Sequence, residues 1–315
     1  MARCDRFYEG LRVAAIVVLL TNMVFLLATT LFFQKLFYQN IVAIFLSIVG
    51  VYYNPKELFF KRVGRHDGVL FFLVYMLLFF SLMWFDYELV GKINDAAGGF
   101  SLYDGHLASW DQYFFGNSPA EKIYLILRLA PALVRTIFFD LLIVSYFLYY
   151  PLVFLGLLYF YFNKDYLQRL SRIHEYSFSV IVVILMSLFM YMLVPVTGPQ
   201  YYQEEIFAEQ VLPFSLFGKL LFDFVAKAHP NRIDCFPSVH SALTMLVTYW
   251  AFKFKLRGRF LLFFLLMLII TATIALRYHY IWDVLAAIPV VIIALCLAKR
   301  VAKFFNLYGG ERKLH

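Results

Sequence analysis

Residues suited to proton transfer and phosphate chemistry stand at the start of an apolar run near the end of the chain. The segment 233–240 contains Pro237, Ser238 and His240, and the apolar run 241–252 follows it directly. Ser238 can cap the first helical turn, where free backbone N–H groups and the helix dipole favour an anion. His240 would lie in that turn and could donate a proton to a phosphate ester oxygen. The alternative is an interfacial turn whose histidine only lies at headgroup level.

A second such group follows about forty residues later. The segment 277–283 reads Arg-Tyr-His-Tyr-Ile-Trp-Asp and also precedes an apolar run. His279 and Asp283 are four residues apart, so on a helix they would share a face and the carboxylate would orient the imidazole. If the intervening residues cross a membrane twice as a hairpin, His240 and His279 return to the same side.

The composition is that of a helical membrane protein that crosses the bilayer several times. Hydrophobic residues make up 63% of the chain and charged residues 15%, and the mean hydropathy is +0.75. These values exclude a soluble domain. In a membrane protein the position of the charges along the chain is more informative than the net charge of +8. We therefore expect no nucleic-acid partner. The three cysteines, Cys4, Cys235 and Cys296, form no close pair and indicate neither a disulfide framework nor a metal motif.

Apolar segments of suitable length predict an all-α polytopic membrane protein with about eight transmembrane helices. The first run is too long for a cleavable signal peptide and reads as an uncleaved span. Two long loops, 86–135 and 197–237, are expected outside the membrane, with an interfacial helix near 110–115 and an amphipathic surface helix at 214–225. The predicted spans are 13–34, 36–55, 68–85, 136–162, 177–196, 238–252, 260–276 and 280–298.

The distribution of cations predicts the orientation in the membrane. With the N-terminus in the cytoplasm, 19 of the 28 lysines and arginines fall in the predicted inner segments, which are 1–12, 56–65, 164–172, 253–259 and 299–313. This bias agrees with the positive-inside rule. It predicts that both long loops and both histidines face the outer side. That side is the periplasm for a bacterial inner membrane or the lumen for a eukaryotic endomembrane.

The two motifs resemble those of the type-2 phosphatidic acid phosphatase superfamily, which includes lipid phosphate phosphatases and sphingolipid headgroup transferases. Pro237-Ser238-Val239-His240 is similar to the family's Pro-Ser-Gly-His, or Pro-Ser-Leu-His in the inositol phosphorylceramide synthase branch. His279 to Asp283 matches its His-x-x-x-Asp motif. His279-Tyr280 and the segment Pro195-Val196-Thr197-Gly198-Pro199 look most like the transferase branch.

The resemblance implies a catalytic core of six helices and a division of labour among the motif residues. His279 would be the nucleophile that forms a phosphohistidine, Asp283 its orienting partner and His240 the general acid. Ser238 and nearby backbone amides would hold phosphate oxygens, with no metal or other cofactor. The implied organisation is two N-terminal helices in 1–66, the catalytic membrane domain in 67–300 and a cytoplasmic tail in 301–315.

The chain departs from the family pattern in its cations. The family's Lys…Arg-Pro motif is absent, Gly198-Pro199-Gln200 stands where some relatives have Gly-Pro-Arg, and Thr273 stands where an arginine is usual. Gln200 and Arg277 are therefore candidate phosphate ligands, although Arg277 could equally be an interface anchor. Further candidates, which could instead meet lipid headgroups, are Arg128, Arg135 and Arg232.

Three functions remain open from the sequence. Few fixed cations suit a phosphodiester better than a phosphomonoester, which favours transfer of a phosphoryl-containing headgroup between membrane lipids. The first alternative is a lipid phosphate phosphatase, and the second is a non-catalytic lipid-binding or transport protein, which would carry ionisable residues near mid-span. Asp140 is expected to pair with Arg135 or Arg128 rather than to serve the site.

Overall fold

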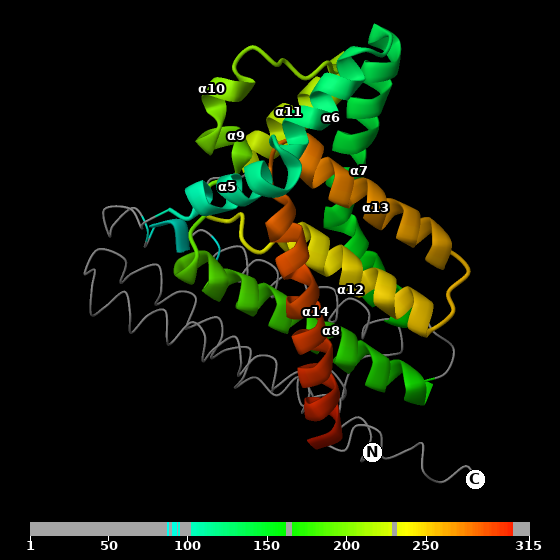
Figure 1. The fold of residues 1–315 in the computed structure, drawn as a ribbon. Helices are drawn as coiled ribbons and strands as arrows, with labels where there is room; N and C mark the ends of the chain where they lie inside the picture. Colours follow the sequence, from blue (N-terminus) through cyan, green and yellow to red (C-terminus); the bar gives the residue numbers. More distant parts are fainter. Residues whose placement is uncertain are drawn as a thin grey trace.

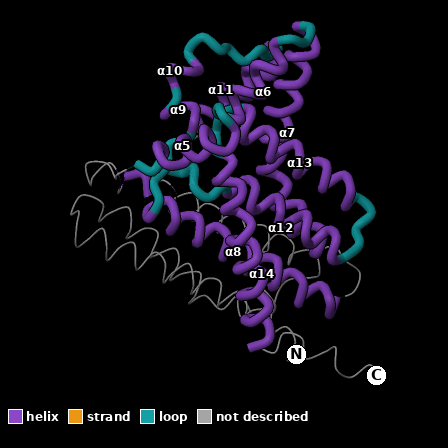
Figure 2. The backbone as a smooth tube through the Cα atoms, in the orientation of Figure 1, coloured by secondary structure: helices purple, strands orange, loops and turns teal. Residues whose placement is uncertain are grey.

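The computed structural model describes residues 87, 90–92, 94, 102–161, 166–228 and 232–304. Within these residues the chain is helical and contains no strand, as Figure 2 shows. One isolated parallel bridge joins Val196 to Asp234. The predicted all-helical class is therefore confirmed for this part of the chain. The predicted spans 13–34, 36–55 and 68–85 lie outside the described residues.

Long helices form where the last five spans were predicted. Among the described residues, three stretches are long and apolar enough to cross a membrane, 132–156, 175–193 and 281–300, and a shorter apolar helix covers 259–275. These helices make the chain an integral membrane protein, while the predicted total of eight spans is not confirmed. The long helices are α7 (Ala132–Tyr161), α8 (Tyr166–Leu193), α12 (Val239–Lys253), α13 (Arg259–Ala275) and α14 (Ile281–Phe304).

The loop predicted at 164–172 is wrong over most of its length. Helix α8 already begins at Tyr166, eleven residues before the predicted start of the span at 177. Residues 166–172 include Gln168 and Arg169, which are good helix formers, and no glycine or proline interrupts them. The helix therefore continues through a polar stretch that hydropathy alone assigns to a loop.

Helix α12 is the centre of the bundle. It packs against α7, α8, α13 and α14, and ten of its fifteen residues are buried. Its far end is fixed by Lys253, whose Nζ lies 3.2 Å from Glu175 Oε2 and 4.2 Å from the centre of the Trp250 ring. Because four helices contact α12, the residues at its N-terminus are held from several sides.

Short helices gather at the end of the bundle where α12 and α14 begin (Figure 1). They are α5 (Asp104–Phe115), α6 (Pro119–Arg128), α9 (Pro199–Tyr202), α10 (Glu204–Phe207) and α11 (Leu216–Ala228). The prediction of a loop over 86–135 with one short helix is thus wrong in part. Residues 87, 90–92 and 94 are helical, and α6 was missed. Proline at its first position favours α6, and its Ile123 and Leu127 pack on the core.

Helix α11 is amphipathic, but its apolar residues do not form the single stripe that the spacing predicts. Phe214, which precedes the helix, and Leu221 pack against a buried cluster around α7 and α13. Phe217 and Phe224 remain 61% and 58% exposed. The helix carries apolar residues around most of its circumference, so one side packs on the bundle and another is left exposed.

The predicted ion pair of Asp140 is also wrong. Its Oδ1 accepts the backbone N–H of Ser215 at 3.1 Å, and no ion pair with Arg128 or Arg135 occurs among the described residues. A Cβ added at Gly218 would overlap the same oxygen. The carboxylate of Asp140 therefore secures the start of α11 against α7, and this close approach requires a glycine.

Candidate active site

The hairpin of α12 and α13 brings the two motif histidines together. His240 lies in the first turn of α12, as predicted, and His279 lies just before α14. Their ring centres are 6.0 Å apart. Both border a cavity of about 30 Å³ whose lining residues are Tyr146, Thr197, Gln200, Tyr201, Ala226, Asp234, Cys235, His240, Tyr278 and His279.

His279 and Asp283 are in contact, but they do not lie one turn apart on the same helix as predicted. Helix α14 begins at Ile281, so His279 precedes it. The Asp283 carboxylate folds back over the first turn, where its Oδ2 accepts the N–H of Tyr280 at 2.8 Å and lies 3.3 Å from His279 Nδ1. The carboxylate thus caps α14 and orients the imidazole at the same time. Both residues are buried, at 4% and 0% exposure.

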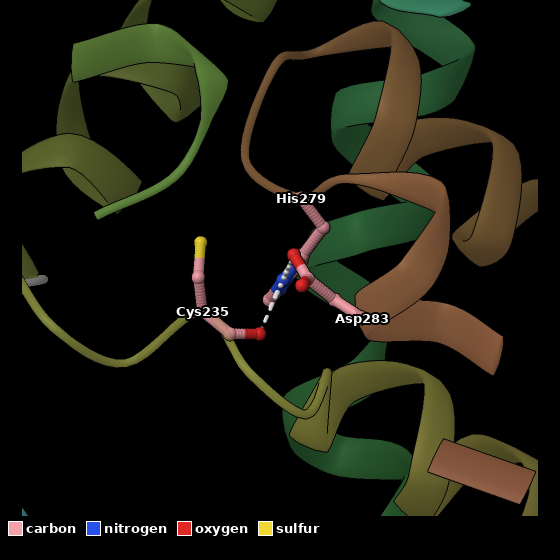
Figure 3. A group of neighbouring side chains, drawn as sticks. All are labelled: Cys235, His279 and Asp283. Atoms are coloured by element: carbon pink, nitrogen blue, oxygen red, sulfur yellow. Dashed lines mark hydrogen bonds and ion pairs between the residues drawn. The ribbon is translucent and has the colours of Figure 1, made fainter. Parts of the chain in front are cut away.

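The surroundings of His279 Nδ1 determine which ring nitrogen carries the proton. Nδ1 lies 2.9 Å from the backbone oxygen of Cys235, in addition to its contact with Asp283, and Figure 3 shows both oxygens beside the ring. A carbonyl and a carboxylate only accept hydrogen bonds, so Nδ1 must be the donor. In the neutral imidazole Nε2 is then unprotonated. That is the form a nucleophile requires.

His240 is held in a cage of tyrosine rings from α7. The Tyr146 ring stacks on it at 4.5 Å and 29°, the Tyr149 ring lies at 4.4 Å, and the Tyr150 ring lies at 6.3 Å nearly perpendicular to it. Tyr146 also places its hydroxyl 3.4 Å from His240 Nδ1. Aromatic faces attract cations, so this cage suits a histidine that carries a proton. These tyrosines were not predicted from the sequence, although their i, i+3, i+4 spacing places them on one helix face.

Ser238 is the N-cap of α12, which confirms the predicted capping role. Its Oγ accepts the N–H of Ser241 at 3.4 Å and lies 3.1 Å from the Ser241 hydroxyl. Its own N–H donates to the backbone oxygen of Asp283 at 3.0 Å. Ser238 is fully buried and is not among the residues that line the cavity. It therefore ties the start of α12 to the start of α14.

Asp104, at the start of α5, is a buried carboxylate that accepts three hydrogen bonds, and it was not predicted from the sequence. Its carboxylate accepts the N–H groups of Thr197 and Gly198, each at 2.9 Å, and the hydroxyl of Tyr280 at 3.1 Å. Its exposure is 0%. The one carboxylate joins α5, the segment before α9 and the residue next to His279. No local pattern marks it, because its partners lie far along the chain.

Gly198 is required where this segment passes the site. Its φ of +92° is in the left-handed region, and a Cβ would lie 2.6 Å from both Cys235 Sγ and the backbone oxygen of Tyr278. The close approach brings Thr197 and Gln200 to the cavity. The N–H of Gln200 donates to the backbone oxygen of Arg277 at 2.9 Å.

None of the four candidate arginines lines the cavity. The Arg232 guanidinium is 5.3 Å from the centre of the Tyr201 ring, which lines the cavity. Arg277 lines a neighbouring, larger cavity. Arg128 is exposed at the end of α6, and Arg135 is half-buried in the first turn of α7. The described lining residues of the smaller cavity include no lysine or arginine. Of the other two predicted phosphate ligands, Gln200 borders the cavity and Ser238 does not.

A metal ion is not favoured by the cluster of potential ligands that the described residues contain. Side-chain atoms of Cys235, His279 and Asp283 lie within 4.8 Å of one another. However, Nδ1 of His279 carries a proton, and the Cys235 sulfur points away from the ring and donates to the Tyr278 oxygen at 2.7 Å. Burial raises the pKa of the Cys235 thiol, with further contributions from the charges of Asp283, Asp234 and Asp104. A thiol rather than a thiolate is a poor ligand and a poor nucleophile.

The described part of the chain is therefore a helical membrane bundle in which a histidine in contact with a carboxylate lies beside a second histidine. The family model of the PAP2 superfamily matches residues 131–297. The chain belongs to this superfamily, as the motifs predict. Its members are generally phosphatases or phosphotransferases, so the chain is a lipid enzyme of that type. Searches of curated proteins and of solved structures found no match.

Proposed function

We propose that the protein is a lipid phosphotransferase that moves a phosphoryl-containing headgroup from one membrane lipid to another on the outer face. The observation that carries the proposal is the state of His279. Its Nδ1–H is held by Cys235 and Asp283, and its ring lies 6.0 Å from that of His240. An unprotonated Nε2 and a neighbouring acid are the two groups that displacement at phosphorus requires.

In the first step Nε2 of His279 attacks the phosphorus of the donor phosphodiester. A nitrogen–phosphorus bond forms, and the bond from phosphorus to the leaving lipid oxygen breaks. His240 enters this step as an imidazolium within its tyrosine cage and gives its proton to the leaving oxygen. The headgroup phosphate is then carried on His279, whose Nδ1–H still faces Asp283.

In the second step the hydroxyl of an acceptor lipid attacks the phosphohistidine. His240 is now neutral and takes the hydroxyl proton, so a new phosphorus–oxygen bond forms and the bond to His279 breaks. Both histidines return to their starting protonation states. The two histidines therefore account for every proton in the cycle, with no metal ion assigned to a step.

The charge of the cavity favours a phosphodiester as substrate. Its described lining has no lysine or arginine and includes the carboxylate of Asp234, to which the hydroxyl of Tyr87 donates a hydrogen bond. A phosphodiester carries one negative charge, whereas a phosphomonoester carries nearly two at neutral pH. The N-terminus of α12 and Gln200 would hold the phosphate oxygens, with Arg232 at the rim. Ser238 would act by capping that N-terminus.

A lipid phosphate phosphatase is the second candidate, because the cavity can admit the water that hydrolysis requires. The space beside the two histidines is about 30 Å³, which is enough to hold a water molecule. Water could therefore replace the acceptor alcohol in the second step. The two candidates use the same attack by His279 and differ in the donor, a phosphodiester or a phosphomonoester, and in the acceptor.

Product analysis separates the two candidates. Purified protein in detergent–lipid micelles would receive an isotopically labelled phosphodiester phospholipid or labelled phosphatidate, each with ceramide or diacylglycerol, and mass spectrometry would follow the label. A new phospholipid supports transfer, while label released as a soluble phosphate compound supports hydrolysis. His279→Ala should abolish both, whereas the matched control His106→Ala, which changes a histidine on α5 outside the cavity lining, should leave both. Full turnover by His279→Ala would refute the mechanism.

A further inference from the structure

A second and much larger cavity lies beside the catalytic one. Its volume is about 600 Å³, within the usual range for a bound small molecule. Gln200 borders both cavities. The wall between them also contains the stacked rings of Phe222 and Tyr278, whose centres are 6.1 Å apart. The residues that line the larger cavity are Gln200, Glu204, Phe207, Ala208, Gln210, Val211, Leu212, Pro213, Phe214, Lys219, Phe222, Leu276 and Arg277.

Arg277 is a buried cation in the wall of this cavity. Its φ of +69° is unusual for a residue with a side chain, and its exposure is 8%. One nitrogen, Nη2, donates to the backbone oxygen of Gln210 at 2.7 Å, and the guanidinium lies 4.2 Å from the centre of the Phe207 ring. Burial lowers the pKa of Arg277 to about 10, so the charge persists at neutral pH.

The hydrogen-bonding groups around Arg277 are not all satisfied. Its Nε is buried and has no hydrogen-bond partner among the described residues, and the same is true of Gln210 Oε1. No carboxylate forms an ion pair with Arg277 in the described part of the chain. The other cation that lines the cavity, Lys219, is already paired with Asp223 at 2.7 Å. A buried guanidinium without a counter-ion is costly unless an anion completes it.

Apart from Gln200 and the exposed Glu204, the rest of the lining is suited to hydrocarbon. Phe207, Leu212, Phe214, Phe222 and Leu276 contribute apolar side chains. Helix α11, which forms one side of the cavity, also exposes a run of apolar residues to its surroundings, namely Leu216, Phe217 and Leu220 at 81%, 61% and 61%. An occupant that matches these surfaces has one anionic group and an apolar body.

We propose that this cavity is a second lipid site, which binds the anionic phosphate headgroup of a phospholipid against Arg277 and is separate from the catalytic cavity. The acyl chains leave along the exposed apolar side of α11. The site goes beyond the proposed function, because its occupant packs on Phe222 and Gln200 without reaching either histidine. A lipid held there is positioned to influence the catalytic cavity through their common wall.

Native mass spectrometry measures this binding without any turnover. The His279→Ala protein in detergent would be titrated with phosphatidylglycerol, which is anionic, and with zwitterionic phosphatidylcholine. We expect one phosphatidylglycerol to bind in preference to phosphatidylcholine. Arg277→Gln should weaken phosphatidylglycerol binding by about tenfold or more, the worth of a hydrogen bond to a charged group. The exposed control Arg128→Gln should bind like the parent protein.

A second variant distinguishes lost binding from a folding defect in Arg277→Gln. Ala208 is exposed at the lining of the cavity, so Ala208→Trp fills the space without changing the arginine, and it should weaken the same binding event. Unchanged phosphatidylglycerol binding in both variants would overturn the proposal and leave the catalytic cavity as the lipid site. Arg277-dependent binding of inorganic phosphate with no preference for phosphatidylglycerol would also overturn it, in favour of a soluble anion. None of these outcomes depends on the transfer reaction.

Discussion

Removal of the Asp104 carboxylate should damage both the stability and the activity of the protein. Three donors converge on it: the N–H groups of Thr197 and Gly198 at 2.9 Å and the hydroxyl of Tyr280 at 3.1 Å. Asp104 is completely buried, so water cannot replace it without rearrangement. The informative series is Asp104→Asn, Asp104→Ala and Tyr280→Phe.

The magnitudes follow from how many hydrogen bonds each substitution removes. Asp104→Ala leaves three buried donors unpaired, each at a cost of about 1–3 kcal/mol. The variant also avoids the cost of burying a charge, so we expect a net loss near the low end, about 3–5 kcal/mol. Asp104→Asn keeps an acceptor oxygen but turns an amide group towards a donor, for a loss of about 2 kcal/mol. Tyr280→Phe removes one hydrogen bond and should cost about 1 kcal/mol.

The activity should fall because Asp104 positions the segment that brings Thr197 and Gln200 to the cavity. A displacement of about 1 Å in such a segment costs about a hundredfold in rate. We expect the apparent melting temperature in detergent to fall least in Tyr280→Phe, more in Asp104→Asn and most in Asp104→Ala. The loss of kcat should follow the same order. The control is Asp223→Asn, which removes only an exposed pair with Lys219. Wild-type stability and turnover in Asp104→Asn would refute the reasoning.

The remaining predictions concern four other features. Burial, together with the charge of a neighbouring carboxylate, raises the pKa of Asp111 from 3.8 to about 7. Between these two values the folded state keeps a proton that the unfolded chain loses, so the stability should fall as the pH rises from 4 to 7. Melting scans in detergent should show this fall, and Asp111→Asn should flatten it. Asp234→Asn should raise kcat/KM for a phosphomonoester relative to a phosphodiester, since it removes a negative charge from the lining; an unchanged ratio contradicts this. Tyr149→Leu should slow turnover of substrates with poor leaving groups more than that of p-nitrophenyl esters, because it opens the cage around the proposed acid; equal slowing of both would contradict the acid role. Cysteines introduced at Asn117 and Gly258 should label from opposite sides of the membrane, as the cation bias predicts; labelling from one side contradicts the topology.

The long helices and the histidine motifs could be predicted from the sequence because both depend on local information. Apolar runs located α7, α12 and α13 to within four residues and the start of α14 to within one, although α14 continues six residues beyond its predicted end. The predicted hairpin placed His240 and His279 on the same side. The start of α8 was misplaced, since hydropathy detects the membrane rather than the end of the helix. His279 and Asp283 were expected to share one face of a helix. They do come into contact, but His279 precedes α14 and Asp283 reaches it by capping the first turn of that helix.

The rest of the site depends on interactions between distant parts of the chain. Asp104 is 93 residues from Thr197 and 176 from Tyr280, so no spacing rule marks it. The position of Arg277 beside a second cavity results from the path of the segment 203–214, which has no strong local pattern. A single sequence gives residue types at these positions but not the partners that define their roles.

The restraints on the proposed nucleophile come largely from the polypeptide backbone. The N–H of His279 donates to the backbone oxygen of Thr273 at 2.9 Å, its Nδ1 faces the backbone oxygen of Cys235, and the backbone oxygen of Asp283 is bound by the N–H of Ser238. Such hydrogen bonds survive when the side chains of Thr273 or Cys235 are exchanged. Of these two positions only Cys235 lines the cavity, so substitutions there could alter headgroup preference while the imidazole of the proposed nucleophile keeps its orientation.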